Sequence, residues 1–340
     1  MDKKLSGIII ILVLIVVVVE GYFLFQTYRN PAKKYTGPME KITLGVEKSL
    51  FPSLVWVAEN KGYFEENGVE VTIKDFDSGR LALKTMLKQG GLDMVTAAQT
   101  PVVSDSFEHS DFVIVAAMVS SYNYVKVSAR RDRGITRPVD LRGKNIGLTK
   151  GSSGQYFHGM FLINNGIQLS EVNVQDIKTS ELVASLQNGT VDAISTWEPQ
   201  VSNAQSALGD NGVTFPAGKI LRANSFFLSN QNFLQANPIV ITRFLQALTQ
   251  AEDFIKENKD EAITIVSERL GWKRDVVSSV WDEYQFGLFL DQTIIQSLEE
   301  QAKWAIQNKL TDKTEVPNYL DFISVDALKK AAPGKAIIVK

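Results

Sequence analysis

The sequence predicts an α/β protein with two lobes of like plan, preceded by an N-terminal transmembrane helix. Three observations support this: an internal repeat, short β-rich runs that alternate with helix-like segments, and a long apolar run that begins at residue 8. The chain has 340 residues, of which 44% are hydrophobic and 22% charged. This length and balance are typical of a folded protein with about two domains.

The N-terminal segment predicts a single membrane span. Residues 8–25 form an 18-residue stretch that is apolar apart from Glu20 and Gly21, close to the minimum length of a transmembrane helix. Lys3 and Lys4 precede it, and no small-residue cleavage site follows it, so we expect an uncleaved anchor. The alternative is a signal peptide that is removed. Residues 26–40 contain prolines and a glycine and are interpreted as a tether.

The body of the chain contains an internal repeat. Residues 87–96 resemble residues 186–196, and the matching positions lie 98 or 99 residues apart. The matching pairs are Gly90 with Gly189, Asp93 with Asp192, and Asn67-Gly68 with Asn165-Gly166. Matches in the same order at nearly one offset predict two copies of one structural unit.

Each copy predicts the order strand, helix, strand, helix, strand. The expected strands include 42–46, 69–74 and 145–149. The expected helices begin at Pro52 and Ser78 in the first copy, and helices end at Gly62, Gly90, Gly166 and Gly189. Strands that alternate with helices imply right-handed crossovers and a parallel sheet in each lobe.

After the second copy the pattern changes. Residues 225–229 predict a strand that returns the chain to the first lobe, and the residues beyond Pro238 predict only helices that cover that lobe. The predicted domains are the anchor and tether at 1–40, lobe 1 at 41–125 plus 226–340, and lobe 2 at 126–225.

Composition favours binding over catalysis. The chain has no cysteine and two histidines, which excludes disulfides and thiol catalysis and argues against a histidine-built metal site or triad. We therefore expect no catalytic residue, no metal and no cofactor, and we interpret His158 as structural. The chain has 36 Lys and Arg residues and 38 Asp and Glu residues, which gives a net charge of −2. This balance does not indicate the basic surface that is typical of nucleic-acid-binding proteins.

Ligands of open parallel α/β sheets lie beyond the carboxyl ends of the strands. This rule selects six loops: 47–52, 76–79, 96–101, 149–155, 179–181 and 196–199. The loop 150–155 is rich in glycine and serine and leads into a helix, so its N–H groups and hydroxyls favour an anion. The alternative for this loop is an ordinary serine-capped helix start.

Three other segments are candidates for the cleft wall. Ser78-Gly79 is a second predicted helix start whose backbone N–H groups suit an anion, and Tyr122 follows an apolar run. Trp197 offers an apolar wall with one donor, and Glu198 offers an acceptor for an ammonium or amide group. The alternative for this last pair is a packed indole with a solvated carboxylate.

Several motifs together resemble one protein family. They are residues 56–64, 75–79, 90–93, 140–144, 150–154, 189–192 and 197–199. In these stretches the chain is similar to the nitrate/sulfonate/taurine solute-binding proteins of ABC importers. The resemblance implies a type II periplasmic-binding-protein fold, in which two α/β lobes enclose a ligand cleft.

The resemblance also implies a function. We expect non-covalent capture of a small, often anionic solute and its delivery to an ABC permease. The binding body is expected to be a monomer outside the cytoplasm. The apolar span at residues 8–25 departs from the family pattern and predicts that this body is tethered to the cytoplasmic membrane. The ligand-binding positions carried over by motif are Ser49, Leu50, Phe51, Ser78, Gly79, Ala98, Gln99, Thr100, Ser152, Ser153, Gly154, Gln155, Trp197 and Glu198, to which the residue pattern adds Tyr122. One alternative is a ligand-sensing domain that signals through a membrane partner. A less expected one is an enzyme like the thiamin-pyrimidine synthase, which consumes an active-site histidine.

Overall fold

The computed structural model describes residues 35–218 and 220–339. The predicted transmembrane run, residues 8–25, lies outside these described residues. Within them, no helix has the length and apolar character needed to cross a membrane.

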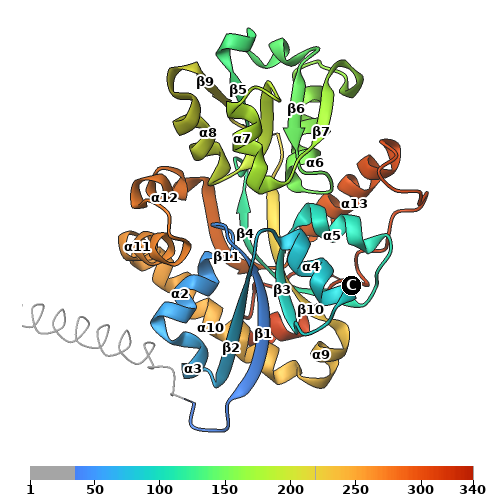
Figure 1. Ribbon diagram of the computed structural model, residues 1–340. Coiled ribbons are helices and arrows are strands. Elements are labelled where there is room, and N and C mark those ends of the chain that lie inside the picture. The colour runs from blue at the N-terminus through green and yellow to red at the C-terminus, as the bar shows by residue number, and fades with distance from the viewer. Residues whose placement is uncertain (1–34, 219, 340) are drawn as a thin grey trace, which may run out of the picture. The chain divides into compact units, whose positions relative to one another are not determined.

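One mixed sheet, sheet A, forms the centre of the first lobe (Figure 1). Its strands are β1 (Glu40–Glu47), β2 (Val69–Phe76), β3 (Met94–Ala98), β4 (Phe112–Ser121), β10 (Ala223–Asn230) and β11 (Tyr284–Phe289), in the order β11-β4-β10-β3-β1-β2. Strands β2, β1 and β3 run parallel, whereas β10 pairs antiparallel with both β3 and β4. Strand β4 is buried along its whole length, as expected of a central strand.

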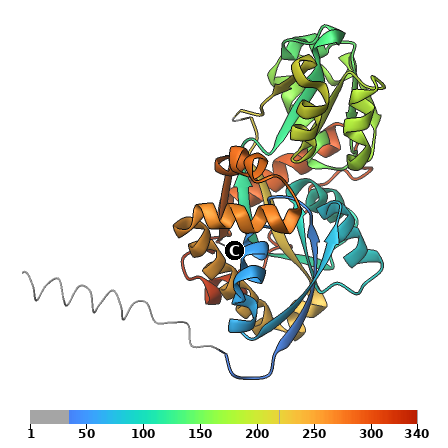
Figure 2. The same cartoon turned by 60° about the vertical axis from the view of Figure 1, so that its left-hand side comes forward.

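A second sheet, sheet B, forms the centre of the other lobe. Its strands are β5 (Val125–Arg130), β6 (Asn145–Leu148), β7 (Asn173–Asp176), β8 (Ala193–Trp197) and β9 (Gly212–Phe215), in the order β7-β6-β8-β5-β9. Strands β7, β6 and β8 run parallel, and β5 is antiparallel to both β8 and β9. The chain passes between the sheets twice, from β4 to β5 and from β9 to β10 (Figure 2). The lobe boundaries given above remain a prediction.

Two expectations from the sequence are corrected. Sheet A is parallel only among β1, β2 and β3, and sheet B only among β6, β7 and β8. Strands β5 and β10 carry the chain between the sheets and run antiparallel to these neighbours. The segment beyond Pro238 is not all helical, because Tyr284–Phe289 forms β11 at the edge of sheet A. An edge strand pairs on one side only, and its short sequence gives a weak local signal.

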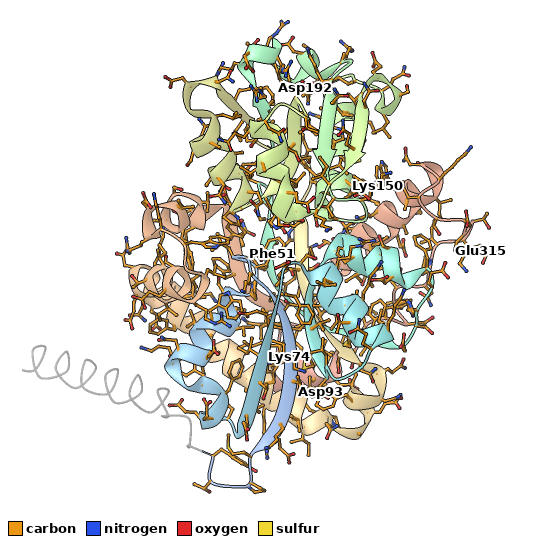
Figure 3. All side chains as sticks on the ribbon, in the orientation of Figure 1. Phe51, Lys74, Asp93, Lys150, Asp192 and Glu315 are labelled. Atoms are coloured by element: carbon orange, nitrogen blue, oxygen red, sulfur yellow. The ribbon has the colours of Figure 1, made fainter. Side chains whose placement is uncertain are left out.

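The internal repeat is visible in matching hydrogen bonds. Asp93 Oδ2 accepts from the backbone N–H of Thr43 at 2.7 Å, and Asp192 Oδ2 accepts from that of Asn145 at 2.9 Å. Figure 3 shows these two aspartates at opposite ends of the body, with Phe51 and Lys150 between them. Each aspartate therefore fixes the start of a parallel strand pair, far from the strand ends that face the other lobe.

Helices cover the sheets. They are α2 (Ser53–Lys61), α3 (Tyr63–Glu66), α4 (Gly79–Lys88), α5 (Gln99–Ser106), α6 (Ser153–Asn164), α7 (Leu182–Gln187), α8 (Gln200–Leu208), α9 (Gln231–Ala236), α10 (Pro238–Glu257), α11 (Lys259–Leu270), α12 (Arg274–Val280), α13 (Gln292–Gln307) and α14 (Asp326–Ala331). One face of α10, which includes Phe244, Leu245 and Leu248, is fully buried. This helix packs on α2, α3 and α14 and so covers lobe 1, as predicted.

Candidate ligand-binding site

A cavity of about 110 Å³ lies between elements of the two lobes, and we call it the interlobe cavity. It is lined by Glu47, Ser78, Gly79, Arg80, Leu81, Lys84, Ala98, Pro101, Tyr124, Thr149, Ser152, Ser153, Thr179 and Trp197. Strands β1, β3 and β8 end at Glu47, Ala98 and Trp197, so three carboxyl strand ends meet here. This is the position that the rule for open α/β sheets predicts.

Two further cavities adjoin the interlobe cavity. The larger, which we call the outer cavity, has a volume of about 470 Å³ and shares Arg80 and Lys84 with the interlobe cavity. The smaller, of about 20 Å³, shares Tyr124 and Ser153 with it. Arg80 and Lys84 thus stand at the border between the interlobe cavity and the outer one.

The lobe 2 wall of the interlobe cavity is the start of α6. Ser152 Oγ donates to the carbonyl oxygen of Thr149 at 2.6 Å and accepts from the N–H of Gly154 at 3.2 Å. The N–H of Gly151 donates to Gln155 Oε1 at 2.7 Å. Among the described residues, the N–H groups of Ser152 and Ser153 have no hydrogen-bond partner, so they remain available for an anion.

The lobe 1 wall is the start of α4. Ser78 caps this helix by accepting from the N–H of Leu81 at 3.3 Å. The N–H of Gly79 donates to Glu47 Oε2 at 3.4 Å, so a side chain of the protein already contacts this helix end. Figure 1 shows α4 and α6 on either side of the region between the two sheets.

Two glycines serve helix packing at these walls. A Cβ atom at Gly79 would lie 2.7 Å from Ala97 Cα, and one at Gly154 would lie 2.7 Å from the carbonyl oxygen of Ser195. Each helix therefore starts in direct contact with the backbone of the strand beneath it. At Gly154 the missing side chain leaves space for strand β8.

Arg80 is a cation that extends across the cavity. A Cβ atom at Gly151 would lie 3.0 Å from Arg80 Nε, which places the guanidinium of lobe 1 against the glycine loop of lobe 2. Arg80 Nε is buried without a hydrogen-bond partner, and neither Arg80 nor Lys84 forms an ion pair within residues 35–218 and 220–339. Burial, and then the charge of Arg80, lower the pKa of Lys84. A bound anion would offset both effects.

An aromatic stack forms another part of the wall. The rings of Phe51 and Tyr124 are stacked with centroids 3.9 Å apart, and those of Tyr124 and Trp197 with centroids 5.7 Å apart. Phe51 is fully buried behind Tyr124, so only Tyr124 and Trp197 line the cavity. The stack fixes the orientation of the two rings that line the cavity.

The predicted site residues divide into three groups. Those that line the interlobe cavity are Ser78, Gly79, Ala98, Ser152, Ser153 and Trp197. Those that line an adjoining cavity instead are Gln99, Thr100, Tyr122 and Gln155. Those that line none of these three cavities are Ser49, Leu50, Phe51, Gly154 and Glu198.

The third group has local structural roles. Ser49 Oγ accepts from the N–H of Phe51 at 3.2 Å in the turn that leads into α2, and Leu50 is buried beside it. Glu198 is 3% exposed, and its Oε2 accepts from the N–H of Ser202 at 3.0 Å near the start of α8. In this structure these side chains make local contacts, and the expectation that Ser49–Phe51 and Glu198 contact a ligand stays a prediction.

Sequence reasoning missed several residues of the cavity. The chemically important ones are Arg80, Lys84 and Tyr124, together with Glu47, which falls in the selected loop 47–52 but was not named as a site residue. Glu47 carried a usable signal, because it directly follows the β-rich run 42–46 at the carboxyl end of a strand. Arg80 carried none, because its contact with Gly151 joins residues 71 positions apart in the chain.

His158 lies away from the interlobe cavity. It is 1% exposed, and burial lowers its pKa to about 4. Neither ring nitrogen has a partner among the described residues. In the same part of the chain, no cluster of three or more histidine, aspartate or glutamate side chains is arranged to hold a metal ion.

The chain matches one family model, described as NMT1/THI5 like, over residues 53–262. The chain belongs to this family. A putative aliphatic sulfonates-binding protein of Bacillus subtilis (strain 168) is 27% identical over 305 residues, which cover 88% of this chain and 91% of the relative.

Solved structures share the fold. The alkanesulfonate-binding protein SsuA of Xanthomonas axonopodis pv. citri, bound to MOPS, matches with a TM-score of 0.73 at 18% identity, over 85% of this chain and all of that one. The desulfurization enzyme DSZB, as a mutant in complex with biphenyl-2-sulfinic acid, matches with a TM-score of 0.60 at 16% identity, over 86% and 98%. The expected periplasmic-binding-protein fold is thereby confirmed, and the same fold also occurs in an enzyme.

Proposed function

We propose that this protein is a solute-binding protein that captures a small sulfonate-type anion between its two lobes and delivers it to an ABC importer. Capture is non-covalent, and closure of the lobes around the ligand is the motion expected for two domains joined by two chain segments. Family membership and the sulfonate-binding relative support the solute class.

The observation that carries the proposal is the position of Arg80. Its guanidinium belongs to lobe 1 but lies against Gly151 of lobe 2, where the N–H groups of Ser152 and Ser153 have no partner in the described chain. A sulfonate offers three oxygens, enough to accept from a guanidinium and from two N–H groups at once. An anion in this position would bridge the lobes and favour their closure.

Replacing Arg80 by glutamine tests the proposal. We expect the parent protein, purified in full length in detergent, to bind at least one of ethanesulfonate, 2-aminoethanesulfonate and MOPS in calorimetry. Arg80→Gln should weaken that binding about thirtyfold, because removal of a half-buried charged partner whose Nε is shielded from solvent costs about 2 kcal/mol. The control is Arg274→Gln, which removes an ion pair with exposed Asp260. Equal affinity in Arg80→Gln and the control would contradict the proposal.

The proposed role is non-enzymatic. A chain without cysteine cannot use thiol chemistry, and His158 is buried outside the interlobe cavity. The cavity instead offers donors, cations and aromatic faces, which suit recognition. Incubation of the full-length protein with a bound sulfonate should return the sulfonate unchanged, as measured by mass spectrometry.

We further propose that residues 8–25 anchor the protein in the cytoplasmic membrane with the body outside the cytoplasm. This rests on the 18-residue apolar run without a cleavage site. Such an anchor would keep the binding lobes close to a permease in the same membrane. The native protein should stay with membranes during carbonate extraction; soluble chains that begin near residues 26–40 would contradict this.

A further inference from the structure

Glu47 is a buried carboxyl group of the interlobe cavity to which the proposed function gives no role. It ends strand β1, is 3% exposed and lines the cavity. Its Oε2 accepts from the N–H of Gly79 at 3.4 Å, and its Oε1 is buried with no hydrogen-bond partner in the part of the chain that the structure describes. A buried polar atom without a partner is rare in a folded protein, so it requires an explanation.

The ionised form of Glu47 has no countercharge. Within residues 35–218 and 220–339, no lysine, arginine or histidine forms an ion pair with it. Its neighbour Lys48 pairs with Asp75 instead, at 3.8 Å. Burial raises the pKa of Glu47 from 4.5 to about 7, and the hydrogen bond from Gly79 opposes this rise only in part. The carboxyl group therefore holds its proton up to near-neutral pH.

The other ionisable groups near Glu47 are two tyrosines and two cations. Tyr124 lines the same cavity, and Tyr284, at the start of β11, interacts with Glu47 electrostatically. Burial raises the pKa of both tyrosine hydroxyls, so they stay neutral. Arg80 and Lys84 line the cavity from α4, and the lobe 2 residues that line it have no acidic or basic side chain. The groups of this cavity whose charge can change are thus Glu47 and Lys84, whose pKa is lowered by burial.

An anion in the interlobe cavity would repel ionised Glu47. The free N–H groups of Ser152 and Ser153 and the guanidinium of Arg80 would hold the anion in the same volume of about 110 Å³ that Glu47 lines. Two negative groups in one buried site cannot both stay ionised without a large cost, so the weaker acid takes up a proton. A sulfonic acid is far stronger than a carboxylic acid, so the proton goes to Glu47. A protonated carboxyl group is a hydrogen-bond donor, and the anion is an acceptor.

We propose that Glu47 binds a proton together with the ligand anion and donates a hydrogen bond to that anion, so that capture of the solute takes up one proton. The inference rests on the proposed function, because it assigns a further partner to the anion of the same site. The proton comes from the solvent and stays on Oε1 of Glu47, and no bond of the ligand changes. Because the bound state holds one proton more than the free state, the affinity must rise as the pH falls.

Calorimetry of sulfonate binding at pH 6 and pH 8, on the full-length protein in detergent, tests this inference. The probe is ethanesulfonate or, if that binds too weakly, whichever of 2-aminoethanesulfonate and MOPS the parent binds better. Because the pKa of Glu47 without ligand is about 7, the parent should bind about tenfold more tightly at pH 6 than at pH 8. At pH 8, titrations in two buffers of different ionisation enthalpy should show uptake of about one proton for each anion bound.

Two variants of Glu47 separate its charge from its hydrogen bond. Glu47→Gln keeps a donor without a charge, so it should bind equally well at both pH values, with an affinity close to that of the parent at pH 6. Glu47→Met has neither charge nor donor, so it should bind about tenfold more weakly than Glu47→Gln at either pH. The control Glu70→Gln, at an exposed carboxylate of β2, should keep the pH dependence of the parent. The difference between the parent and Glu47→Gln also removes any titration of the ligand itself.

Each outcome decides a different point. Equal affinity of the parent at pH 6 and pH 8, without proton uptake, overturns the inference and leaves the proposed sulfonate capture standing; this result needs no variant. If the pH dependence persists in Glu47→Gln, another group such as Lys84 takes up the proton and the inference is wrong. Equal affinities of Glu47→Gln and Glu47→Met would show that Glu47 donates nothing to the anion. If the parent binds no sulfonate at millimolar concentration at either pH, the proposed function and this inference both fail.

Discussion

Replacing Glu47 by glutamine should stabilise the ligand-free protein at pH 8 and leave its stability nearly unchanged at pH 4. Burial raises the pKa of Glu47 from 4.5 to about 7, and the hydrogen bond from Gly79 opposes that rise only partly. An acid whose pKa is raised by folding holds its proton more tightly in the native state. The native state is therefore penalised progressively as the pH increases from 4.5 through 7.

The size of this effect follows from the pKa difference. At 1.36 kcal/mol for each pH unit, the rise from 4.5 to about 7 corresponds to about 3 kcal/mol of native-state destabilisation at pH 8. Glutamine has nearly the same shape, keeps an acceptor for Gly79 and carries no charge, so it removes this penalty. For a chain of this size, about 3 kcal/mol corresponds to a melting temperature higher by roughly 6 °C.

Thermal melts of the full-length parent and Glu47→Gln in detergent, from pH 4 to pH 8 without ligand, provide the assay. The two melting curves should nearly coincide at pH 4 and separate above pH 5, with the variant higher. Glu70→Gln, at an exposed carboxylate, serves as the matched control and should follow the parent. Parallel pH profiles for parent and Glu47→Gln, or a variant that melts lower at pH 8, would refute the assignment of an unpaired buried acid.

Two other predictions concern lobe 2. Burial lowers the pKa of His158 from 6.5 to about 4, so its contribution to stability is complete above pH 6.5 and is lost as the pH falls through 4. His158→Leu should therefore melt close to the parent at pH 7. Between pH 7 and pH 4 its free energy of unfolding should fall by about 3 kcal/mol less than that of the parent. If chemical denaturation shows the same loss of stability for both proteins over this pH range, the prediction is wrong. Ser153→Asp places a carboxylate next to the free N–H groups of α6 and should weaken sulfonate binding at least tenfold, whereas Ser206→Asp, on the exposed side of α8, should not. Calorimetry that finds equal affinities for these two variants would show that no anion binds at this helix start.

Much of the architecture follows from local sequence. The alternation of strands and helices could be predicted because β-rich runs and helix caps are short-range signals. The two copies of the internal repeat were recognisable because matching glycines and aspartates lie at one offset along the chain. Asp93 and Asp192 show why the repeat persists, since each accepts the same kind of hydrogen bond from a backbone N–H of the neighbouring parallel strand. The loops at the carboxyl ends of the strands were predictable for a similar reason, because the topology of a parallel sheet determines which ends meet.

The content of the site depended on tertiary structure. Ser49–Phe51 belong to a predicted ligand loop but are buried, with Phe51 stacked on Tyr124, and a loop sequence does not specify which side chains point inward. Glu198 was placed in the cleft by its neighbour Trp197, yet it contacts the N–H of Ser202 instead. Strand β11 joins sheet A through pairing with β4, a contact between distant parts of the chain.

The sequence by itself determined the two α/β units, their repeat and the loops from which a site is built. Only the tertiary structure decided that Arg80 contacts Gly151 across the lobes and that Glu47 is buried without a countercharge. The physical reason is range: propensity and periodicity act over a few residues along the chain. Charge pairing and burial, by contrast, depend on which surfaces meet in the folded chain, and these come from distant segments, as for Arg80 and Gly151, which are 71 positions apart.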